Sequence, residues 1–211
     1  MQDKKAILIP DATYHIYNRA NGNERLFLTE QNYHYFLEKY SQYISPIADI
    51  FCYCLMPNHF HFLIRIKSEE SLNKTFKVSE NTPNLTGFEN LSGLISKKFS
   101  DFFNSYSKAI NKQENRKGSL FMRPFKRKRI TDEKYLKKLV HYIHCNPVES
   151  RLTNKPEEWK YSSYNAIIDV TGFKLSRLTI KKAEVIDWFE DKENFIYCHR
   201  FSPKATGIED F

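Results

Sequence analysis

Short stretches of alternating, β-branched or aromatic residues stand out in the first third of the chain, and such stretches are typical of strands. They predict three strands, over residues 12–18, 49–56 and 60–66. The second and third are separated by Pro57-Asn58, which is turn chemistry, so the pair predicts a β-hairpin. A dense basic stretch with interspersed apolar residues, 123–130, is expected to form a fourth strand.

Apolar residues at helical spacing follow each of these regions. They predict helices over residues 29–43, 91–111 and 132–146, with a further helix near 179–190. Thr29 and Thr131 suit the N-caps of the first and third helices, and Pro147 is expected to stop the third. Residues 68–90 are polar and contain proline and glycine, so we expect a long surface loop there.

The order of the predicted elements is β-α-β-β-α-β-α followed by a tail. The simplest packing is an α+β fold: a ferredoxin-like, mostly antiparallel sheet with helices on one face. The other face stays open in this arrangement and can carry a functional site. We therefore expect one domain over residues 1–170 and a C-terminal extension over residues 171–211, to which the sequence assigns no role.

The charge balance favours a polyanionic partner. Among 211 residues there are 33 Lys and Arg against 25 Asp and Glu, a formal net charge of +8. Nucleic acid or an anionic membrane surface would be attracted, although a basic surface can also serve solubility alone. No apolar run is long enough to span a bilayer, so a membrane protein is not expected. Four cysteines form no disulfide framework, which points to the reducing cytoplasm.

Candidate chemistry begins with the histidine pair His59 and His61. Alternate side chains of a strand share a face, so both imidazoles project together while Phe60 and Phe62 project into the core. Two neighbouring imidazoles are a starting point for a divalent metal site. The alternative is a pair of solvated histidines on a half-exposed strand.

The third predicted helix adds two polar residues to this picture. Its apolar stripe is formed by Leu136, Leu139, Val140 and Ile143. Tyr142 and Asn146, one turn apart, lie on the shoulder of that stripe and can reach over the sheet. Asn146 offers a carbonyl oxygen to a metal, and Tyr142 offers a phenol as nucleophile. The alternative is that Tyr142 belongs to the core and Asn146 caps the helix.

Two motifs in this order resemble a known family. The run Met-Pro-Asn-His-Phe-His-Phe-Leu-Ile at 56–64, followed by Tyr-Ile-His-Cys-Asn-Pro-Val at 142–148, resembles the single-tyrosine HUH transposases of insertion sequences, and most closely their REP-associated tyrosine transposases. Supporting stretches are Tyr-His-Ile-Tyr-Asn-Arg at 14–19, Gly-Ser-Leu-Phe at 118–121, and Trp-Lys-Tyr-Ser-Ser-Tyr at 159–164. The resemblance covers residues 10–168.

This resemblance implies specific roles. His59 and His61 would be the HUH metal ligands, joined by Asn146 where other branches carry Gln, Glu or His, and Tyr142 would be the nucleophile. The cofactor would be Mg²⁺ or Mn²⁺, and the substrate single-stranded or hairpin DNA, cut and rejoined through a 5′-phosphotyrosine. It further implies a bacterial cytoplasmic protein, at the nucleoid when bound to DNA, acting as a monomer or homodimer.

Basic residues are the candidates for holding DNA phosphates. They are Lys97, Lys98, Arg123, Lys126, Arg127, Lys128 and Arg129. The alternative is a charged face that only contacts solvent.

Three rival functions remain open or are set aside. One is a DNA- or RNA-binding regulator that keeps the fold without the chemistry. Another is a structural zinc site built from the cysteines and histidines of the hairpin, namely Cys52, Cys54, His59 and His61. A histidine-triad nucleotide hydrolase needs a third histidine where Leu63 stands, so that class is set aside.

Overall fold

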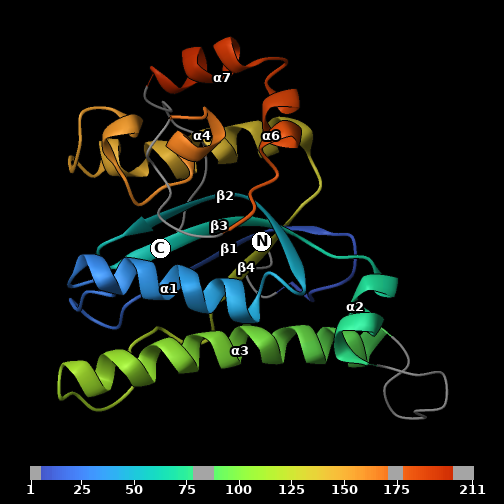
Figure 1. The fold of residues 1–211 in the computed structure, drawn as a ribbon, viewed down its shortest axis with the longest axis vertical. Helices are drawn as coiled ribbons and strands as arrows, with labels where there is room; N and C mark the ends of the chain where they lie inside the picture. The colour runs from blue at the N-terminus through green and yellow to red at the C-terminus, as the bar shows by residue number, and fades with distance from the viewer. Residues whose placement is uncertain (1–5, 78–87, 171–177, 202–211) are drawn as a thin grey trace.

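Four antiparallel strands form a sheet at the centre of the molecule, in the order β2-β3-β1-β4 (Figure 1). The computed structural model describes residues 6–77, 88–170 and 178–201. The elements are β1 (Thr13–Arg19), α1 (Glu30–Tyr43), β2 (Ala48–Met56), β3 (His59–Ile66), α2 (Glu69–Phe76), α3 (Phe88–Gln113), β4 (Lys126–Ile130), α4 (Glu133–Glu149), a 3₁₀ turn (Pro156–Glu158), α5 (Tyr164–Ile167), α6 (Lys182–Trp188) and α7 (Lys192–His199). The α+β class and the ferredoxin-like antiparallel sheet are thus confirmed.

One face of the sheet packs against α1 and α3, which lie below it in Figure 1. The core on this side is aromatic: Phe36 of α1 and Phe102 of α3 meet with ring centroids 4.8 Å apart, and Phe60 and Phe62 of β3 point into the same cluster. These side chains are fully buried, so the pattern of β3 fixes which of its faces turns inward.

The opposite face is covered as well, which corrects the expected open face. Helix α4 crosses it and packs on β2 together with α6, while α7 packs on α4 and lies above it in Figure 1. Leu139, Val140 and Ile143 of α4 are 0% exposed and meet Phe51 and Cys52 of β2. The physical reason lies in β2, which is apolar on both sides and therefore needs a cover on both.

Three local predictions were also wrong. Within residues 68–90, expected to be a loop, Ser68 accepts a hydrogen bond from the Ser71 amide and caps α2, whose first turn is acidic; residues 78–87 lie outside the described residues. Helix α4 is capped by Asp132, one residue after the expected Thr131. It also continues past Pro147 to Glu149, because a proline near the end of a helix removes only one hydrogen bond.

The two edge strands of the sheet, β2 and β4, are protected from pairing with another chain in different ways. Next to β2, the amide of Leu55 donates to Tyr161 and the amide of Lys181 donates to Ile50, so segments from the C-terminal part run along this edge. The other edge is β4, whose sequence Lys-Arg-Lys-Arg-Ile is rich in charge. Charge on an edge strand discourages pairing with another chain.

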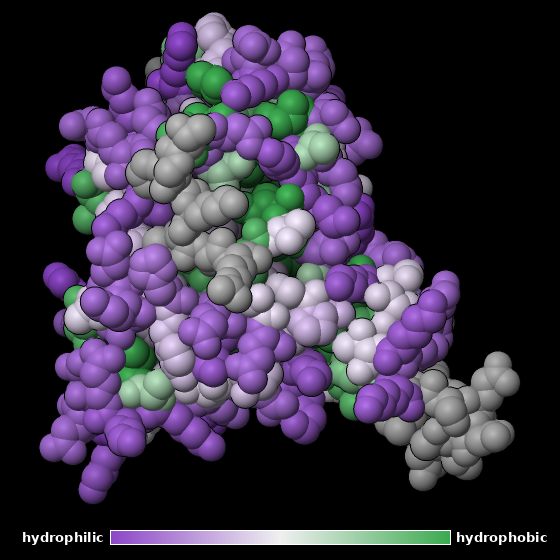
Figure 2. All heavy atoms as spheres, viewed as in Figure 1, coloured by the Kyte–Doolittle hydropathy of each residue, from purple (hydrophilic) through white to green (hydrophobic). Residues whose placement is uncertain are grey.

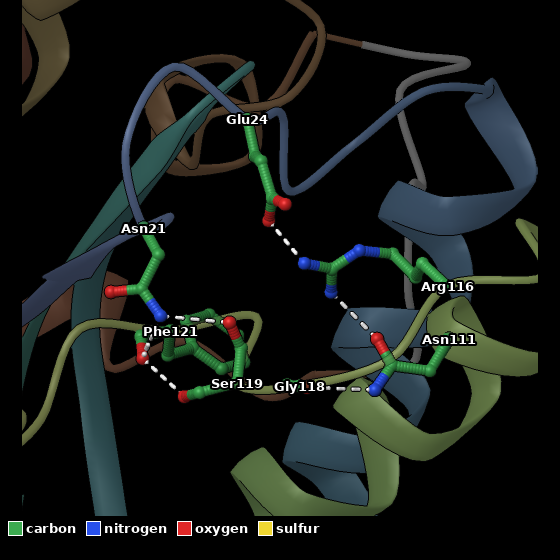
Figure 3. Close-up of polar contacts among 7 residues, drawn as sticks. All are labelled: Asn21, Glu24, Asn111, Arg116, Gly118, Ser119 and Phe121. Carbon is green, nitrogen blue, oxygen red and sulfur yellow. Dashed lines mark hydrogen bonds and ion pairs between the residues drawn. The ribbon is translucent and has the colours of Figure 1, made fainter.

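The chain leading into β4 is tied to the loop that follows β1 (Figure 3). Arg116 forms an ion pair with Glu24 and donates to the side-chain oxygen of Asn111 at 2.6 Å. The side-chain amide of Asn21 donates to the carbonyl oxygens of Ser119, at 2.7 Å, and of Phe121. These contacts hold the basic segment against the end of β1.

The visible surface is largely hydrophilic, and hydrophobic side chains gather mainly around α4, α6 and α7 in the view of Figure 2. Within the described part of the chain, none of the helices combines the length and the apolar character that crossing a bilayer requires.

Candidate functional site

The histidine pair lies on the face of the sheet that α4 covers. His59 and His61 alternate with buried Phe60 and Phe62, and their ring centroids are 5.1 Å apart. Pairing across the sheet sets their neighbours: His61 stands opposite Tyr17 of β1, and His59 opposite Arg19. The strand period therefore places both imidazoles on one face, as the sequence predicts.

Helix α4 brings the other two predicted residues to the same place. Oδ1 of Asn146 lies 3.1 Å from Nε2 of His59, and the ring of Tyr142 meets that of His61 edge-on at 5.6 Å. Asn146 and Tyr142 are four residues apart and so share one side of the helix. The apolar stripe of α4 holds that side over β3, and four polar groups from two distant segments converge.

Each histidine is held from behind by a residue that the sequence reasoning did not single out. Nδ1 of His59 lies 2.7 Å from Oδ1 of Asn58, and Nδ1 of His61 lies 3.0 Å from Nε2 of His15. Both contacts engage Nδ1, so Nε2 is the nitrogen that each histidine offers to the site. Alternation in β1, which puts His15 and Tyr17 on one face, was the available signal for His15.

Burial keeps both imidazoles neutral near pH 7. It lowers the pKa of His59 to about 4, against a smaller opposing effect of the hydrogen bond to Asn146. It lowers the pKa of His61 well below its usual value, and the neighbouring His59 and His15 add to the shift. A neutral imidazole has a lone pair for a metal, so this environment suits coordination.

The donor set fits a hard or borderline divalent cation. Octahedral Mg²⁺ takes ligands at about 2.1 Å, which places adjacent ligand atoms about 3.0 Å apart. The separation of 3.1 Å between His59 Nε2 and Asn146 Oδ1 matches one such edge. Imidazole nitrogen with a carbonyl oxygen is also a donor set that Mn²⁺ accepts.

The rival zinc site is not assembled. Cys54 does stand opposite His61, but Cys52 stands opposite Leu63. Both thiols are buried, which raises their pKa values. Across residues 6–77, 88–170 and 178–201, no group of three or more His, Cys, Asp or Glu side chains is placed to hold a metal.

The basic strand β4 divides its charges between the two faces of the sheet. Lys126 pairs with Tyr17 and Lys128 with His15, so both lysines belong to the face of the histidines. Lys126 Nζ lies 5.8 Å from the centre of the Tyr17 ring. Arg127 belongs to the other face, where its Nε donates to Ala6 at 2.6 Å.

The remaining candidate cations lie away from the histidines. Lys97 and Lys98 belong to α3, on the opposite side of the sheet, and Lys97 is paired with Asp101 at 2.7 Å. Arg129 shares the face of Arg127 by alternation. Arg123 is exposed and lines a groove between α3 and the segment leading into β4.

A buried polar chain connects α4 to the C-terminal extension. His144 Nε2 lies 2.8 Å from Ser163 Oγ, and His144 Nδ1 lies 3.1 Å from Nε2 of His199 in α7. The His199 Nδ1 contacts the Phe195 carbonyl at 2.7 Å. With two neutral imidazoles, one direction satisfies these three contacts: Ser163 donates to His144, His144 donates to His199, and His199 donates to Phe195.

Comparison with known proteins supports the fold. No family model matches the sequence, and no curated protein matches it in sequence. The structure is similar to that of a REP-associated tyrosine transposase bound to a REP hairpin, with a TM-score of 0.56 and 13% sequence identity. The match covers 82% of this chain and 88% of that chain. The resemblance inferred from the motifs is thus confirmed at the level of the fold.

Proposed function

We propose that this protein is a metal-dependent tyrosine transposase of the REP-associated kind, which cleaves and rejoins single-stranded DNA at hairpin-bearing ends. The observation that carries the proposal is the convergence of His59, His61 and Asn146 with Tyr142 on one face of the sheet. The fold shared with a transposase that binds a REP hairpin supports it. Residues 1–170 would form the catalytic domain and residues 171–211 its extension.

The three proposed ligands would hold Mg²⁺ or Mn²⁺, which when bound polarises the scissile phosphate and offsets its charge. Tyr142 attacks the phosphorus through its phenol oxygen. A bond forms between that oxygen and phosphorus, the bond to the 3′ oxygen breaks, and the phenol proton is lost while the 3′ oxygen gains one. The products are a 5′-phosphotyrosine and a 3′-hydroxyl, and the reverse attack by a 3′-hydroxyl rejoins strands without ATP.

The surroundings of the site are suited to a polyanion. Arg19 stands opposite His59, and it contributes to lowering the pKa of that histidine, so its positive charge acts on the site. Lys126 and Lys128 belong to the same face and are our first candidates for phosphate contacts near the scissile bond. All four proposed site residues are brought together within one chain.

A covalent-adduct assay tests the proposal. Purified protein is incubated with labelled single-stranded oligonucleotides that carry hairpins from the DNA flanking its gene, with Mn²⁺ or with EDTA. We expect a denaturation-resistant protein–DNA adduct that requires the metal and is lost in Tyr142→Phe. Tyr135→Phe, on the same helix, is the matched control and should retain it. Hairpin binding without any adduct would instead favour a regulator that lacks the chemistry.

A further inference from the structure

A third histidine stands behind the proposed metal ligands. His15 of β1 is 1% exposed, and its ring stacks on that of Tyr17 with centroids 4.5 Å apart and planes inclined by 22°. Its ring also lies 5.2 Å from the ring of His61, with planes inclined by 24°. A buried ring in contact with two aromatic neighbours has little freedom to rotate, so its contacts are fixed by packing.

The contact to His61 is a hydrogen bond between two ring nitrogens, Nε2 of His15 and Nδ1 of His61, at 3.0 Å. A neutral imidazole has one N–H and one lone pair, so one ring must donate and the other accept. If His15 donates, the proton of His61 lies on Nε2 and that nitrogen is closed to a metal. If His61 donates, its Nε2 presents a lone pair.

We propose that His15 is a positioning residue that accepts the proton on Nδ1 of His61 and so holds His61 in its metal-binding tautomer. The inference rests on the proposed function in taking His61 as a metal ligand. Asn58 provides a parallel for His59, since a carbonyl oxygen 2.7 Å from Nδ1 can only accept. Losing such a supporting contact typically weakens metal binding about 10- to 100-fold.

Three substitutions in the full-length protein separate this role from simple packing. In H15Q the amide oxygen has about the reach of the lost Nε2 and can accept from His61, whereas in H15N the shorter side chain cannot reach it. H15F fills the space without an acceptor. We expect the Mn²⁺ affinity of H15Q, measured by titration calorimetry, to stay near that of the wild type. The affinity of H15N and H15F should fall about 10- to 100-fold.

The tautomer can be observed directly. Nitrogen-15 NMR of the imidazole rings with Mg²⁺ bound should place the proton of His61 on Nδ1 in the wild type and in H15Q. Thermal unfolding without metal shows whether each variant is folded, and the H15Q and H15N pair keeps the test valid if H15F is not.

The outcomes distinguish the inference from the proposed function. H15N with wild-type Mn²⁺ affinity, or a metal-bound His61 protonated on Nε2, would overturn the role of His15 alone. Wild-type protein that binds no Mn²⁺ would overturn both.

Discussion

Removing the two lysines of β4 that share the face of the histidines should reduce the salt dependence of DNA binding. Lys126 and Lys128 stand opposite Tyr17 and His15, whereas Arg127 between them points to the other face and is bonded to the Ala6 carbonyl. A single strand therefore offers both the perturbation, Lys126→Ala with Lys128→Ala, and its control, Arg127→Ala.

The expected size follows from the number of phosphates released. Each phosphate contact contributes about 0.7 to 0.9 to the slope of log affinity against log salt concentration. Two contacts therefore contribute about 1.4 to 1.8 to this slope. When the salt concentration rises from 50 to 200 mM, the double lysine variant should lose about 7- to 12-fold less affinity than the wild type does. Arg127→Ala should leave the slope unchanged and instead lower the thermal stability, because it loses the Ala6 contact and the stacking on Phe125.

Fluorescence anisotropy with a labelled hairpin oligonucleotide, at four or more KCl concentrations, measures the slope. A Tyr142→Phe background prevents cleavage during the titration, so that binding alone is followed. An unchanged slope in the double lysine variant, or an equal reduction in Arg127→Ala, would refute the assignment of the phosphate contacts to one face of β4.

Three further predictions concern metal binding and stability. Asn146→Ala should weaken Mn²⁺ binding, measured calorimetrically, by more than about tenfold, the lower end of the loss typical of a supporting contact; wild-type affinity would exclude Asn146 as a ligand. Burial lowers the pKa of His199 from 6.5 to about 3, so only the unfolded chain takes up its proton between these values. The free energy of unfolding should therefore fall as the pH drops below 6.5, by at most about 1.4 kcal/mol per pH unit for this group, and denaturant titrations should show a flatter dependence in His199→Gln. Leu139→Ala, at a fully buried position of α4, should cost about 2–5 kcal/mol in the same titrations, and a cost under 1 kcal/mol would contradict the packing of α4.

Much of the site geometry could be read from local periods. The period of two in β3 places His59 and His61 together, and the helical period places Tyr142 and Asn146 on one side of α4. The same strand period divides Lys126 and Lys128 from Arg127 and Arg129. These features depend only on neighbours along the chain, so the sequence is sufficient to predict them.

Other features depend on contacts between distant segments. The hydrogen bond between His15 and His61 requires the register of β1 against β3, which no local pattern specifies. The hydrogen bonds that link Ser163, His144 and His199 form only when the C-terminal extension packs against α4. Helix α4 covers the second face of the sheet, and the apolar character of β2 on both sides indicates such a cover. The prediction of an open face did not take this signal into account.

The most direct test of the central claim is to locate the covalent bond between protein and DNA. Trypsin cleavage after Lys138 and Arg151 releases a peptide of residues 139–151. Of the 13 tyrosines in the chain, this peptide contains only Tyr142. After reaction with a hairpin oligonucleotide and Mn²⁺, followed by nuclease trimming, mass spectrometry should find this peptide with an added 5′-nucleotide on Tyr142. An adduct on a peptide that holds another tyrosine, or none under conditions where the hairpin is bound, would contradict the proposed chemistry.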